Sequence, residues 1–171
     1  MFHDWENFYL IVGSAAGALI GLMFVVVTLT AGLEPSRVSR GAQVYITPIV
    51  FHFAIVVVVS AIAVVPELPP REVSVILLLA AAIGFAYSAA TAIRIFRLGW
   101  AETHWSDKYF YGILPAIAYV GLAGAACAVW LAPRPAAFAV AATVLAVLLL
   151  SIRDAWDLAT SIVNSARDRR G

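Results

Sequence analysis

The stretch NFYLIVGSAAGALIGLMFVVVTLTAGL, residues 7–33, contains no Asp, Glu, Lys or Arg. A helix rises about 1.5 Å per residue, so about 20 apolar residues cross the hydrocarbon core of a bilayer. A water-soluble fold interrupts such a stretch with polar residues every few positions. Residues 7–33 therefore predict a transmembrane helix, retained in the mature protein because acidic residues precede it instead of a basic leader.

Four further charge-free stretches give most of the chain the same character. They are residues 41–66, 73–93, 109–133 and 135–152. Of the 171 residues, 63% are hydrophobic and 12% are charged, about half the charged fraction of a soluble domain. Runs such as residues 54–59 do not alternate between apolar and polar, which argues against a transmembrane barrel. We expect an all-α membrane protein, one transmembrane domain over 1–171, with five helices at about 8–33, 44–66, 73–97, 109–132 and 136–165.

The basic residues are distributed unequally between the two sides that five crossings define. One side carries only Arg71 and Arg134. The opposite side carries all the others: Arg37, Arg40, Arg94, Arg97, Lys108, Arg153, Arg167, Arg169 and Arg170. Cytoplasmic loops are enriched in Lys and Arg, so we place the N-terminus outside the cytoplasm and the C-terminus inside it.

Three glycines in the first stretch, Gly13, Gly17 and Gly21, follow one another at intervals of four. This spacing places them on one helix face, where a second helix can approach closely. The sequence leaves open whether that helix belongs to the same chain or to a neighbouring copy.

His52 lies about 12 Å into the hydrocarbon when counted from Val44 at 1.5 Å per residue. A polar ring at that depth is expected to face the bundle interior or a wet cavity rather than lipid. One interpretation is a pore-lining or proton-responsive group, because imidazole titrates near neutrality. The other is a neutral histidine bonded to a backbone carbonyl or to a hydroxyl such as that of Ser88 or Tyr119.

Asp154 and Asp157 lie near the inner end of the last helix, with Arg153 adjacent to them. Acidic groups around a shared axis would attract cations if several subunits assembled. Alternatively, Arg94 or Arg97 pairs with these carboxylates and fixes the helices together. Both roles can coexist.

The remaining motifs give no indication of an enzyme. There is no glycine-rich phosphate loop and no nucleophile beside a base, so we expect no catalytic residue. His3 and His104 fall at opposite membrane edges, so neither can join His52 to hold a haem, and we expect no metal or other cofactor. Cys127 is the only cysteine, which excludes an internal disulfide, and we expect it to be a small buried residue. Nucleic acid is not an expected partner.

Two segments resemble small bacterial inner-membrane proteins of unassigned function. They are Ile152-Arg153-Asp154-Ala155-Trp156-Asp157 in the last helix and the glycine-rich run 13–21 in the first. The resemblance implies a bacterial inner-membrane setting and no particular activity.

These observations favour a homo-oligomeric, channel-like or transport-related protein, with His52, Asp154 and Asp157 as polar elements of a pathway. The alternative is a non-conducting assembly, regulatory or anchoring subunit that docks on another membrane protein through its glycine face. In both hypotheses the lipid bilayer surrounds the chain.

Overall fold

The computed structural model describes residues 2–31, 38–97 and 109–167, with side chains over 2, 4–28, 46–94, 109–132 and 134–160. Within these ranges the chain is helical and contains no strand. The elements in chain order are the 3-10 helix η1 (His3–Trp5), α1 (Glu6–Ala31), α2 (Val38–Ala63), α3 (Pro70–Arg97), the π-helix η2 (Tyr109–Ile113), α5 (Leu114–Ala128) and α6 (Pro133–Arg167). The described residues include five helical spans long and apolar enough to cross a membrane, with η2 and α5 forming one of them. The expected all-α class is confirmed.

The helix ends differ from those expected by a few residues. Helix α2 begins at Val38 instead of 44. Arg40 limits the apolar stretch that the sequence shows, but a charged residue does not end the backbone hydrogen bonds of a helix. Helix α5 ends at Ala128 instead of 132, since a turn follows it. Helix α6 begins at Pro133 instead of 136, because the fixed φ of proline suits the first turn of a helix.

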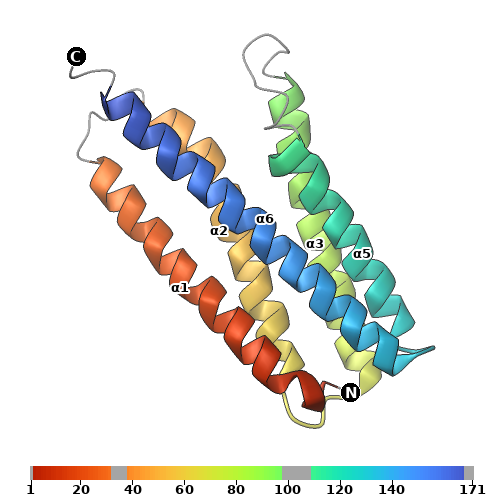
Figure 1. Ribbon diagram of the computed structural model, residues 1–171. Coiled ribbons are helices and arrows are strands. Elements are labelled where there is room, and N and C mark those ends of the chain that lie inside the picture. The colour runs from red at the N-terminus through yellow and green to blue at the C-terminus, as the bar shows by residue number, and fades with distance from the viewer. Residues whose placement is uncertain (1, 32–37, 98–108, 168–171) are drawn as a thin grey trace.

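The helices pack as antiparallel neighbours in chain order. Helix α1 packs mainly on α2, α3 packs mainly on α5, and α6 contacts both α2 and α5 (Figure 1). Helix α6 therefore joins the two hairpins. The N-terminus, the α2–α3 connection and the α5–α6 connection lie at one end, called the N-terminal end below, and the C-terminus lies at the other, called the C-terminal end (Figure 1).

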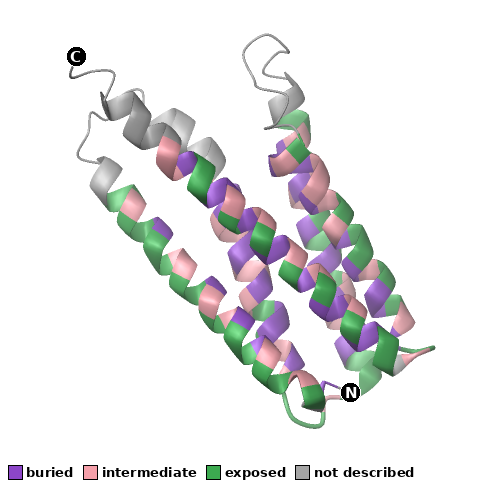
Figure 2. Cartoon of the chain, viewed as in Figure 1, coloured by how far each residue is buried: buried purple, intermediate pink, exposed green. Residues whose placement is uncertain are grey.

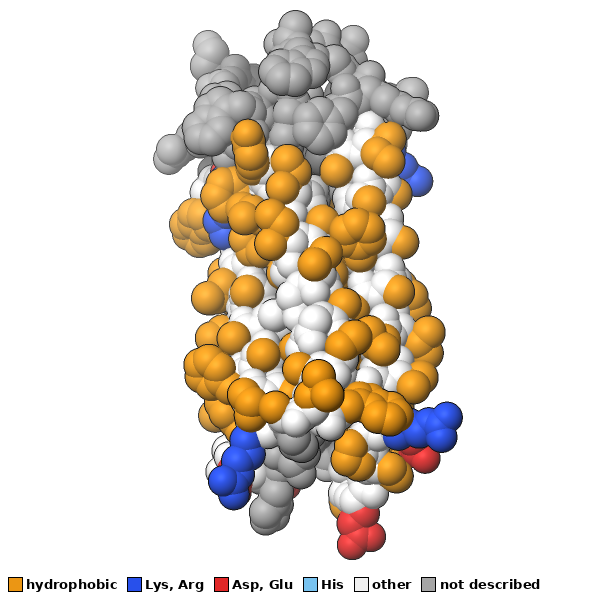
Figure 3. All heavy atoms as spheres, turned by 90° about the vertical axis from the view of Figure 1, so that its right-hand side faces the viewer, with side chains coloured by type: hydrophobic (Ala, Val, Ile, Leu, Met, Phe, Trp, Pro, Cys, Tyr) orange, Lys and Arg blue, Asp and Glu red, His pale blue; other side chains and the backbone are white. Residues whose placement is uncertain are grey.

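Burial is uneven across the bundle. In α1, 17% of the most apolar span is buried, whereas 44% is buried in both α2 and α6, and Figure 2 shows α1 mostly exposed or half-buried. Large apolar side chains such as Ile11, Phe24 and Leu79 are exposed. Hydrophobic side chains are spread over the face seen in Figure 3, and both basic and acidic side chains lie at the N-terminal end. Such a surface is compatible with a lipid environment.

Cys127 is exposed, contrary to the expectation of a buried residue. It lies on the face of α5 that points away from the neighbouring helices, next to the fully buried Ala126. A small apolar residue suits lipid as well as a helix contact, so residue type alone does not determine the face.

Candidate functional site

Polar side chains are buried along the interior of the bundle, on α2, α3 and α6. They are His52, Ser60, Ser74, Ser88, Thr91, Ser151 and Asp154. Several of the hydroxyls donate to carbonyls of their own helix, as Ser88 does to Gly84 and Ser151 does to Val147. Such bonds satisfy a hydroxyl locally. His52 and Asp154 are the two buried residues with acid–base chemistry, and each lies in a different environment.

His52 is 3% exposed and contacts helix α5 through a hydrogen bond between its Nδ1 and the Tyr119 hydroxyl, at 2.8 Å. Tyr119 is 0% exposed and is one of the two hydroxyl partners expected from the sequence. Phe51 and Tyr87 stack on each other beside the imidazole, with ring centroids 4.1 Å apart. The Nε2 atom is buried and has no hydrogen-bond partner among the described residues.

Gly84 on α3 provides the space for the Tyr119 ring. A Cβ at this glycine would lie 2.3 Å from a carbon of that ring, closer than two carbons approach. The contact explains why α3 carries glycine here, and it holds the tyrosine hydroxyl toward His52. The sequence alone gives no sign of this contact, because a pattern of small residues does not say which aromatic ring packs against them.

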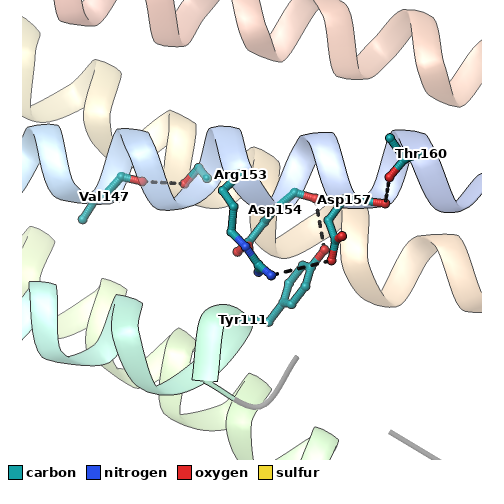
Figure 4. Close-up of polar contacts among 7 residues, drawn as sticks. Tyr111, Val147, Arg153, Asp154, Asp157 and Thr160 are labelled. Carbon is teal, nitrogen blue, oxygen red and sulfur yellow. Dashed lines mark hydrogen bonds and ion pairs between the residues drawn. The ribbon is translucent and has the colours of Figure 1, made fainter. Parts of the chain in front are cut away.

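A second cluster lies nearer the C-terminal end, where η2 meets α6 (Figure 4). The Arg153 guanidinium is 3.0 Å from the Asp154 carboxylate and 4.0 Å from that of Asp157. Asp154 has a side chain 3% exposed, against 51% for Asp157. The same guanidinium lies over the Phe110 ring, 3.5 Å from its centroid, which is favourable cation–π geometry. The Tyr111 hydroxyl donates to the main-chain carbonyl of Asp154 at 3.0 Å.

Within the described residues, both carboxylates are paired from within α6, and the pairing expected from Arg97 lies outside those residues. Arg153 binds both carboxylates from within α6, one residue from Asp154 and four from Asp157. Arg94 is exposed and pairs with no carboxylate in the described part of the chain, and the side chain of Arg97 lies outside that part. Tyr111 and Phe110 in the π-helical turn make a hydrogen bond and a cation–π contact between the fourth span and α6. Such turns interrupt α-helices frequently at functional sites, and sequence periodicity gives no signal for them.

The two polar groups are separate along the bundle. Tyr119, which binds His52, and Tyr111, which binds the Asp154 carbonyl, are eight residues apart on the same span, or about 12 Å at 1.5 Å per residue. Both His52 and Asp154 are buried inside one protomer, whereas Asp157 is exposed. The predicted pore around a shared axis needs these groups at the surface between subunits, and the two buried residues do not lie there.

The three glycines of α1 fall into two environments. A Cβ at Gly13 would lie 2.9 Å from Ser60 Cβ on α2, so this glycine allows a close helix contact within the chain. Gly17 and Gly21 are exposed, and a Cβ at either would meet nothing within 4 Å. Of the alternatives left open, packing within the chain therefore applies to Gly13 alone.

No group of three or more His, Cys, Asp or Glu side chains comes together among the described residues. The side chain of His3 and the whole of His104 lie outside the described residues. No protein-family model, curated protein or solved structure matches the chain.

Proposed function

We propose that the protein is a multi-pass protein of the bacterial inner membrane with a transport-related function. In this proposal the N-terminal end lies outside the cytoplasm, and each protomer contains a proton-responsive centre formed by His52 and Tyr119. The observation that carries the proposal is the burial of an imidazole midway along a membrane span, with one ring nitrogen bonded to a hydroxyl and the other without a partner. Ionisable residues within transmembrane helices are expensive to bury and are most often functional.

The His52–Tyr119 contact has two states that differ in the direction of its hydrogen bond. A neutral His52 with its proton on Nε2 accepts a hydrogen bond at Nδ1 from the Tyr119 hydroxyl. An imidazolium donates from both nitrogens, so the tyrosine oxygen must then accept and its own proton must turn elsewhere. In this tautomer, protonation of His52 therefore turns the Tyr119 hydroxyl proton away from the imidazole, while the ring stays packed against Gly84 of α3.

The Arg153–Asp154–Asp157 cluster supplies the second polar element of the proposal. It lies about 12 Å from His52 along the fourth span, and it contains one buried and one exposed carboxylate. The exposed carboxylate of Asp157 attracts cations and protons from water. The carboxylate of Asp154, which is paired with Arg153, extends the charged cluster into the bundle interior. Since His52 and Asp154 lie inside a single chain, this version of the function requires no shared axis between subunits.

Proton flux into reconstituted vesicles tests the proposal. A potassium diffusion potential drives protons into vesicles containing the purified protein, and an entrapped pH-sensitive dye reports acidification. We expect flux above that of empty vesicles, and His52→Ala is expected to reduce it about a hundredfold, the lower end of the range for loss of a proton-transfer group.

Two tyrosine variants provide a matched comparison for this experiment. Tyr119→Phe removes the hydroxyl bonded to His52 and is expected to reduce flux, whereas Tyr87→Phe alters a neighbouring ring that stacks on Phe51 and is expected to leave flux unchanged. All variants must retain the wild-type melting temperature within a few degrees. Equal flux from wild-type protein and His52→Ala, or no flux above empty vesicles, contradicts the proposal.

The second candidate function, a non-conducting subunit that docks on another membrane protein or on its own copy, is favoured by one observation on α1. Gly17 and Gly21 lie exposed, with open space where side chains would be. We expect Gly17→Leu to abolish association on native electrophoresis or in co-purification. Gly124→Leu is the matched control, because Gly124 on α5 is also exposed with nothing within 4 Å. Association that survives Gly17→Leu, or that Gly124→Leu abolishes equally, contradicts this candidate.

A further inference from the structure

A pocket of about 530 Å³ opens at the N-terminal end of the bundle, far from His52 and from the Arg153 cluster. It lies between the beginning of the chain and the α2–α3 connection, which are neighbours in Figure 1. Its volume falls within the range of small-molecule sites, which is about 300–1,000 Å³.

The pocket combines apolar walls with two carboxylates. The walls are formed by aliphatic residues, prolines and one aromatic ring, among them Phe2, Ile62 and Val73. The charged residues of the described lining are Glu6 and Glu67. Phe2 is 7% exposed and packs edge-on against the Tyr9 ring, so this wall is fixed by the protein interior. No basic residue is among the described lining residues.

The two carboxylates have different local reasons to be present. Glu6 is in the first turn of α1, where a negative charge also stabilises the helix N-terminus. Glu67 lies in the α2–α3 turn with a φ of 54°, in the left-handed region that glycine adopts more readily. Glu67 is exposed, lies just before the N-terminus of α3 and lines the pocket, so its charge is available at the pocket rim.

We propose that this pocket binds a hydrophobic organic monocation, such as an onium ion or an amphiphilic amine. The apolar walls favour the hydrocarbon part of such a molecule, and the two carboxylates favour its positive charge over a neutral molecule of the same shape. Charge complementarity is the basis of the assignment, since apolar walls alone would accept any lipid chain.

Binding of tetraphenylphosphonium to the purified full-length protein, measured by equilibrium dialysis, tests the assignment. Neutral triphenylphosphine oxide serves as the uncharged comparison. A charge about 4 Å from a solvated carboxylate gains about 1 kcal/mol, so we expect Glu6→Gln and Glu67→Gln each to weaken binding of the cation about fivefold. Binding of the neutral compound should not change.

Two further variants separate the charge effect from structural damage. Glu67→Gly removes the carboxylate in a residue that accepts the same φ without strain, so it should weaken cation binding as Glu67→Gln does and leave the melting temperature intact. Glu72→Gln removes an exposed carboxylate in the first turn of α3 that does not line the pocket, and it should leave affinity unchanged. Equal affinity for the two compounds, no measurable binding of the cation, or wild-type affinity in the Glu6→Gln/Glu67→Gln double variant overturns the assignment.

Discussion

Helices α1 and α6 are both apolar enough to span a membrane, yet they occupy opposite roles in the bundle. Helix α1 packs mainly on α2 and leaves most of its surface exposed, whereas α6 contacts both α2 and α5 and buries 44% of its span against 17% for α1. The buried polar residues Ser151 and Asp154 belong to α6, and α1 has no buried charged residue in its described part. Mean apolarity therefore identifies the spans, while the neighbours that each helix contacts decide how much of it is buried.

The largest effect is expected from removing the buried charge of α6. Asp154→Ala leaves the half-exposed Arg153 without its closest carboxylate, and it should lower the free energy of unfolding by about 3 kcal/mol. Asp157→Ala, at an exposed carboxylate 4.0 Å from the same arginine, should cost less than about 1 kcal/mol. Reversible unfolding in mixed micelles provides the measurement, and equal losses for the two variants would mean that Asp154 is solvated.

The next effect compares the same substitution in the two helices. Leu148 on α6 is 5% exposed and Leu22 on α1 is 57% exposed. Leu148→Ala leaves a cavity and should cost about 2.5 kcal/mol, whereas Leu22→Ala changes a lipid-facing residue and should stay within about 0.5 kcal/mol. A large loss for Leu22→Ala in the same unfolding assay would show that α1 is covered by another protein helix.

The glycines extend the comparison to close helix contacts. Gly84→Ala forces a methyl group into the Tyr119 ring and should destabilise the protein by about 2 kcal/mol. Gly17→Ala meets open space and should be neutral or slightly stabilising, because alanine is the better helix former. The midpoints of thermal unfolding in detergent measure the difference, which would vanish if the ring of Tyr119 were free to move.

The smallest expected effect is the loss of one hydrogen bond. Tyr119→Phe keeps the ring against Gly84 and removes the hydroxyl bonded to His52, so it should cost about 1 kcal/mol. The nitrogen chemical shifts of His52 should change at the same time, since the ring loses its partner at Nδ1. Unchanged shifts in the phenylalanine variant would contradict the contact.

The spans were predictable from the sequence, because uninterrupted apolar stretches have no other stable environment than lipid. The inward direction of His52 and its bond to a hydroxyl such as that of Tyr119 were also within reach, since a polar ring at that depth must find a partner. The ion pair between Asp154 and its own neighbour Arg153 could not be singled out, because Arg94 and Arg97 were equally good partners on a linear chain; the pairing from Arg97 stays a prediction. The π-helical turn at Tyr109–Ile113 and the single intrachain role of Gly13 leave no mark on the sequence pattern.

Thiol reactivity in reconstituted vesicles tests the central claim most directly, namely that the polar centre faces the interior of one protomer. In a Cys127→Ala background, His52→Cys, Gly17→Cys and Asp157→Cys each receive a water-soluble and a lipid-soluble thiol reagent. The account predicts that Asp157→Cys reacts with the first reagent, Gly17→Cys reacts with the second, and His52→Cys reacts with neither. Rapid labelling of His52→Cys by the water-soluble reagent would place it in an aqueous pore, and labelling by the lipid-soluble reagent would place it at the surface; either result would contradict the account.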